Sequence, residues 1–141
     1  MAHTLWILCA VMNVAIAVLH IIVIYYGEPA YRYFGAGEWM ATQAGAGSMI
    51  PALITGVITL AFFVFAGFNL SGAGYVLLPL TFYALLAITA VYLLRGGVIV
   101  AIPFMEQQVS RFDLVSSYIA FAIGLVHAAA LYLTYFVKST T

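Results

Sequence analysis

The sequence predicts an all-α membrane protein, a four-transmembrane-helix antiparallel bundle with two long loops on one face. Of the 141 residues, 67% are hydrophobic and 6% are charged, against roughly 45–50% and about 25% in soluble domains. So few charged side chains cannot cover a soluble domain of this size, and the mean hydropathy of +1.18 places the chain in a bilayer. Four stretches are long enough to cross it, since a spanning helix needs about 20 mostly apolar residues.

Charge and cysteine content exclude several classes of protein. Four Lys and Arg balance four Asp and Glu, so the chain has no basic surface for nucleic acid. The single cysteine, Cys9, excludes an intrachain disulfide and any site that needs two thiolates. Together with the hydrophobic composition, these features exclude a soluble enzyme, a zinc ribbon, a nucleic-acid binder and a disordered chain.

The first span is predicted over residues 4–26 and the second over residues 48–70. No Lys or Arg precedes the first apolar run, and the run is too long for a signal peptide, so we expect a retained helix. Ser48 is the expected N-cap of the second span. Pro51 falls in its first turn, where the missing N–H costs nothing.

The third span is predicted over residues 75–95 and the fourth over residues 114–136. The short link 71–74 makes the third helix an antiparallel neighbour of the second, with Pro79 in its first turn. A continuous helix over residues 75–105 would be about 46 Å long, against a hydrocarbon core of about 30 Å. We therefore expect a bend at Gly96-Gly97 and an interfacial segment over residues 96–113. The four spans would form one domain, residues 1–141, with both termini on one side.

The two long loops, residues 27–47 and 96–113, lie on the same side in this topology. Together with Arg95 at the end of the third span, they hold seven of the eight charged residues, and long ordered loops are more often functional than short ones. The simpler interpretation is that they only seal the bundle. The candidate site on this charged face comprises Glu28, Arg32, Glu38 and Arg95. We expect Arg95 to end the third helix and to reach the interface, Glu38 or Glu28, because a charge at the bilayer centre costs at least about 2.5–3.5 kcal/mol.

Aromatic residues in the first loop indicate that it lies in the membrane interface, with Tyr33 and Trp39 at headgroup level. The run Tyr-Arg-Tyr-Phe-Gly-Ala-Gly-Glu over residues 31–38, together with Leu94-Arg95-Gly96, resembles small bacterial four-helix membrane proteins. The resemblance covers the chain in outline, and its specific motifs cover only these two stretches. It implies a multi-pass integral protein of the bacterial inner membrane and carries no activity with it.

Ionisable and amide groups inside the spans form a second candidate site, because such groups are costly in lipid and are often functional. Its members are Asn13, His20, Thr55 and His127. At 1.5 Å per residue, Asn13 and His127 both lie about 20 Å below the charged face. We therefore expect them to face each other across the first and fourth helices. The alternative is that each histidine is only a neutral imidazole that bonds a neighbouring helix.

Haem ligation through His20 and His127 is disfavoured, because their depths differ by about 11 Å at 1.5 Å per residue. No cofactor is predicted, and no metal, since neither histidine has a third ligand nearby. The leading hypothesis is a non-enzymatic integral membrane protein that acts through association or lipid contact, with membrane lipids and a homo-oligomer as its partners. One alternative is an oligomeric transporter or channel subunit with a polar path through Asn13, His20 and His127. The other is an enzyme or binding protein for a lipid or quinone at the charged face.

Overall fold

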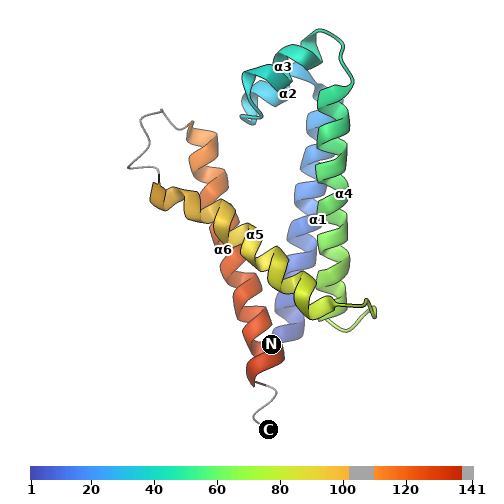
Figure 1. The fold of residues 1–141 in the computed structure, drawn as a ribbon, viewed down its shortest axis with the longest axis vertical. Coiled ribbons are helices and arrows are strands. Elements are labelled where there is room, and N and C mark those ends of the chain that lie inside the picture. The colour runs from blue at the N-terminus through green and yellow to red at the C-terminus, as the bar shows by residue number, and fades with distance from the viewer. Residues whose placement is uncertain (102–109, 138–141) are drawn as a thin grey trace. The chain divides into compact units, whose positions relative to one another are not determined.

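The computed structural model describes residues 1–101 and 110–137, and these form helices and turns without a strand. Four helices are long and apolar enough to cross a membrane, which confirms the predicted fold class. The elements, shown in Figure 1, are α1 (Ala2–Tyr26), α2 (Glu28–Tyr33), α3 (Glu38–Gly45), α4 (Ile50–Gly72), α5 (Thr81–Ala101), α6 (Arg111–Tyr132) and a π-helical segment (Leu133–Val137) that continues α6.

The chain divides into two compact units. The terminal unit comprises residues 1–12 and 65–141, and the hairpin unit comprises residues 13–64. Helices α1 and α4 each contribute one part to each unit. A single domain over residues 1–141 stays a prediction.

In the terminal unit, α5 and α6 pack backbone against backbone at two glycines. A Cβ added to Gly96 would lie 2.5 Å from the Cα and N atoms of Phe121. A Cβ added to Gly124 would lie 2.8 Å from Cδ2 of Leu93. Small residues at helix contacts allow the backbones to approach, which strengthens van der Waals packing in lipid.

Helix α5 continues through Gly96 and Gly97 to Ala101, so it does not end at residue 95 as predicted. A glycine inside a helix costs only about 1 kcal/mol relative to alanine, and the close contact with α6 requires one at position 96. Helix α5 also begins at Thr81 rather than residue 75, so its 21 residues fit the bilayer without a bend. The part of the predicted interfacial segment at residues 102–109 lies outside the described residues.

Hydrogen bonds of two hydroxyls, at the end of α4 and at the start of α5, explain why α5 begins later in the chain than predicted. The Ser71 hydroxyl accepts the Leu78 N–H at 3.2 Å and bonds the Thr81 hydroxyl at 2.7 Å. The Thr81 hydroxyl in turn donates to the Leu78 carbonyl at 2.7 Å. Leu80 has a φ of 57°, which no helical residue adopts. The predicted place of Pro79 in the first turn is therefore wrong, since the helix begins two residues after it.

The start of α4 agrees with the sequence. The Ser48 hydroxyl accepts the Ile50 N–H at 3.3 Å. Pro51 lies in the first turn, as predicted, and is buried.

Helix α6 begins earlier than predicted. Ser110 is its N-cap, with its hydroxyl accepting the Asp113 N–H at 3.0 Å and donating to the Asp113 carboxylate at 2.6 Å. Arg111 and Asp113 thus belong to the first turn of the helix and not to the loop. An acidic residue in the first turn also interacts favourably with the helix dipole.

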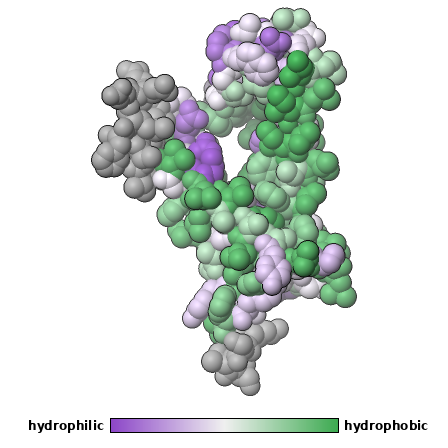
Figure 2. Space-filling model, viewed as in Figure 1, coloured by the Kyte–Doolittle hydropathy of each residue, from purple (hydrophilic) through white to green (hydrophobic). Residues whose placement is uncertain are grey.

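In the hairpin unit, the first long loop folds into α2 and α3. Both helices contribute to a buried cluster with the end of α1, formed by Val23, Ala30, Tyr31 and Ala41. Tyr33 and Trp39 remain 76% and 57% exposed. Hydrophilic residues gather over α2 and α3, whereas hydrophobic side chains cover the beginning of α4 (Figure 2). The unit therefore has one polar end and an apolar body.

We predict that Gly96→Ala lowers the free energy of unfolding by about 1–3 kcal/mol, the usual cost of overpacking. The reason is the contact with the Phe121 backbone, which a flexible side chain cannot relieve. Gly97→Ala is the matched control, because its Cβ would meet no described atom within 4 Å. Reversible unfolding in detergent micelles, followed by circular dichroism, measures both. Equal stabilities of the two variants would contradict the close contact.

Candidate functional site

Three of the four charged-face residues bond one another in the hairpin unit. The Arg32 guanidinium lies 2.9 Å from Oε1 of Glu28 and 2.7 Å from Oε1 of Glu38. The hydrogen bond to Glu28 and the negative charge of Glu38 raise the pKa of Arg32. Because both carboxylates compensate this one cation, the group carries a net negative charge and is no site for an anion.

Arg95 belongs to the terminal unit and lies within α5, so the expectation that it ends the helix is wrong. Its guanidinium donates to the hydroxyls of Ser116 and Ser117 on α6. Those hydroxyls themselves donate to the Asp113 carbonyl. Among the described residues of the terminal unit, Arg95 thus has two neutral acceptors on α6, whereas its pairing with Glu38 or Glu28 of the hairpin unit stays a prediction.

Each of the two histidines in the spans makes the same kind of local hydrogen bond. Nδ1 of His20 lies 2.8 Å from the Ile16 carbonyl, and Nδ1 of His127 lies 2.9 Å from the Ile123 carbonyl. A carbonyl oxygen only accepts, so Nδ1 carries a proton in each ring, and Nε2 of the neutral ring then presents a lone pair. A neutral imidazole in this tautomer is an acceptor at Nε2.

Their surroundings differ. His127 is fully buried, stacked on Tyr92 at a ring distance of 5.2 Å and met edge-on by Trp6 at 6.0 Å. Its Nε2 has no hydrogen-bond partner among the described residues. His20 is only partly buried and lies 5.2 Å from the Phe62 ring. Of these two histidines, only His127 therefore combines full burial with an acceptor that has no partner among the described residues.

Thr55 and Asn13 are both buried in the hairpin unit. The Thr55 hydroxyl lies 3.1 Å from the Tyr31 hydroxyl, which ties α4 to the folded loop. The sequence placed Tyr31 in the interface and offered no sign of this partner. Asn13 and His127 belong to different units, so their predicted pairing stays a prediction.

Sequence reasoning missed Asn69. It is fully buried in the terminal unit, and neither its amide oxygen nor its amide nitrogen has a hydrogen-bond partner among the described residues. We predicted that the second span ends at residue 70, which made Asn69 a terminal residue. Because α4 continues to Gly72, the amide lies inside the helix. A lone amide in an apolar run was the signal that could have identified it.

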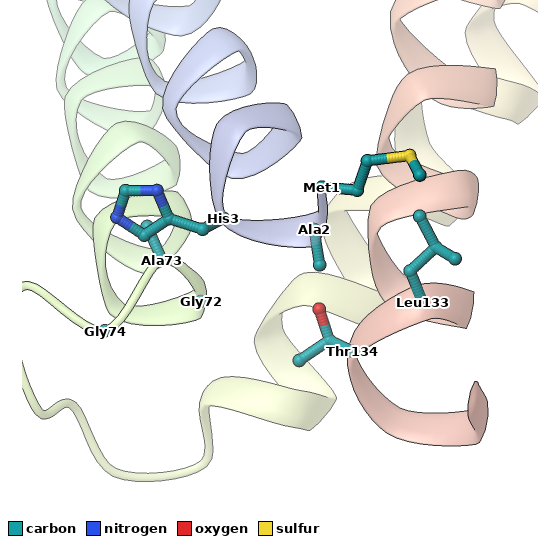
Figure 3. A pocket seen from close by; sticks show the side chains of 8 residues that line it. All are labelled: Met1, Ala2, His3, Gly72, Ala73, Gly74, Leu133 and Thr134. Carbon is teal, nitrogen blue, oxygen red and sulfur yellow. The ribbon is translucent and has the colours of Figure 1, made fainter. Parts of the chain in front are cut away.

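A pocket of about 500 Å³ opens at the end of the terminal unit where α1 begins and α4 ends. Figure 3 shows its lining side chains, from Met1, Ala2, His3, Gly72, Ala73, Gly74, Leu133 and Thr134.

Trp6 contacts two of the residues that line this pocket. The indole N–H donates to the Thr134 hydroxyl at 2.9 Å. A Cβ added to Gly72 would lie 3.1 Å from the Trp6 ring. Because Trp6 also meets His127, one side chain connects the pocket lining to the buried imidazole.

Among the described residues, no group of three or more His, Cys, Asp or Glu side chains could hold a metal ion. Comparison with protein-family models, with curated proteins and with solved structures finds no match to this chain.

We predict that the Tyr31–Thr55 hydrogen bond stabilises the hairpin unit. Tyr31→Phe and Thr55→Val should each lower the free energy of unfolding by about 1–3 kcal/mol, because each leaves a buried hydroxyl without its partner. The double variant should lose less than the sum of the two. Denaturant unfolding in micelles measures this cycle, with Tyr33→Phe as an exposed control. Strictly additive losses would show that the two hydroxyls do not interact.

Proposed function

We propose that this multi-pass membrane protein is non-enzymatic and acts through association of its helices with a second copy of the chain and through lipid contact. The bacterial inner membrane is the proposed location, on the resemblance of the loop motifs. The four apolar helices support the membrane part of this proposal directly.

One observation supports the proposal most strongly, namely how little of each spanning helix the chain itself covers. In the most apolar window of the four helices, 28%, 22%, 28% and 39% of the residues are buried. On α4, exposed side chains recur with the spacing of a helix–helix seam, three or four residues apart. They are Leu53, Val57, Leu60 and Val64. Such a stripe fits either a second helix or acyl chains.

The charged residues support the same proposal. Arg32 pairs with both Glu28 and Glu38, so the one cation of this group is already compensated within the chain. An enzyme or binding site for a lipid or quinone at this charged face has less support for that reason. The transporter alternative, with its polar path through Asn13, His20 and His127, has one observation in its favour, the buried unpartnered Nε2 of His127.

We predict that native mass spectrometry of the protein released from phosphatidylethanolamine and phosphatidylglycerol nanodiscs detects dimers or larger oligomers with retained lipid. The variant Val57→Ala with Leu60→Ala should reduce the oligomer fraction several-fold, because packing contacts drive helix association in lipid.

Val11→Ala is the matched control, since Val11 is equally exposed but lies on α1. It should leave the distribution unchanged. A monomer without retained lipid would refute the proposal. An oligomer insensitive to the α4 variant would place the association on another helix.

A further inference from the structure

We propose that the terminal unit holds a binding site for a neutral, membrane-soluble molecule. The hydroxyl group of this molecule donates a hydrogen bond to Nε2 of His127. The site comprises His127, the aromatic side chains against it, the amide of Asn69 and the pocket beside Trp6. It goes beyond association and lipid contact, because it selects a ligand by its hydrogen-bonding group.

The protonation of the His127 imidazole determines which hydrogen-bonding group the ligand must carry. Nδ1 of His127 donates to the Ile123 carbonyl, so Nε2 can only accept. This nitrogen is buried, and the described residues supply no donor to it. The indole N–H of Trp6 does not serve, because it donates to Thr134 instead. A ligand hydroxyl is the complement of such an acceptor.

Asn69 supplies a second point of recognition. It lies three residues before Gly72 on α4 and so shares the face of the helix that meets Trp6. Both polar atoms of its amide lack a partner among the described residues, so it can donate to a ligand oxygen and accept from a ligand hydroxyl. Two unpartnered polar side chains, both fully buried, are costly in a bilayer unless something bonds them.

Trp6 lies where a ligand would pass from the pocket to His127. The indole contacts Gly72 and Thr134, which line the pocket, and its edge meets the imidazole. Thr134 belongs to the π-helical segment, a rare element that occurs frequently at functional sites. A rotation of the indole away from Thr134 would open the pocket toward His127.

The side chains that line the pocket suit a neutral ligand. Its described side chains include no Asp, Glu, Lys or Arg, and the polar ones are His3 and Thr134 (Figure 3). The rings of Trp6 and Tyr92 beside His127 suit a phenolic ring such as a hydroquinone head group. An aliphatic alcohol such as a diacylglycerol shares the same hydroxyl chemistry, and the experiment distinguishes the two sources.

The test follows ligand binding by the fluorescence emission of Trp6. The chain has two tryptophans, so Trp39→Phe leaves Trp6 as the only one in an otherwise intact protein. In nanodiscs, we expect a short-chain hydroquinone or a short-chain diacylglycerol to change Trp6 emission saturably. The dimethyl ether of the same hydroquinone, which lacks the donor, should bind at least tenfold more weakly. A response to the diacylglycerol alone would assign the site to an aliphatic alcohol.

Two variants locate the site. In the Trp39→Phe background, His127→Phe should weaken the affinity at least tenfold, and His20→Phe should leave it unchanged. His20 is the matched control, because it makes the same Nδ1 bond within the hairpin unit. If His127→Phe fails to fold, Asn69→Leu decides, with an expected loss of at least fivefold. Absence of a saturable response, equal affinity for the ether, or unchanged affinity in a folded His127→Phe or Asn69→Leu variant would overturn the proposal.

Discussion

The hydrocarbon of a bilayer offers no partner to a polar side chain, so each hydroxyl, amide or imidazole in a spanning helix needs one within the protein. Six of these side chains use one local device, a bond from the side chain to the carbonyl four residues earlier. The hydroxyls of Thr59, Thr89, Ser117 and Thr134 and the imidazoles of His20 and His127 all make it. The device needs no neighbouring helix, and it leaves the outer faces of the spans apolar.

The same device determines what remains available for function. A hydroxyl that donates to its own helix can still accept, as Thr134 does from Trp6 and Ser117 does from Arg95. An imidazole that donates through Nδ1 keeps one lone pair at Nε2. In the terminal unit this lone pair, on His127, and the amide of Asn69 are the buried side-chain groups for which the described residues provide no partner. Both are therefore where a ligand of this unit is expected to bind.

The fold class could be predicted because it depends on composition and on the length of apolar runs, which are properties of the sequence alone. The start of α4 could be predicted for a similar reason, since Ser48 and Pro51 act within one turn. The passage of α5 through Gly96 could not, because it depends on contact with Phe121, 25 positions further along the chain.

Of the candidate site, the types of polar residue were predictable and their partners were not. Glu28, Arg32 and Glu38 lie within one loop, so their opposite charges could have indicated that they pair, although we did not predict it. The serine partners of Arg95 lie on α6, whose register on α5 no local pattern reveals. Asn69 was missed because its burial depends on two more residues of α4 than the hydropathy pattern indicated.

The most direct test of this account is nitrogen-15 magnetic resonance of the imidazoles, with His3→Gln used to leave only His20 and His127. The account predicts that both rings are the tautomer protonated at Nδ1, each with an Nε2 that bears no proton. For His127, the Nε2 shift should move on addition of a hydroxyl ligand, whereas that of His20 should not. A ring protonated at Nε2 at His127 would contradict the account, because its acceptor would then be absent and the bond to Ile123 could not form.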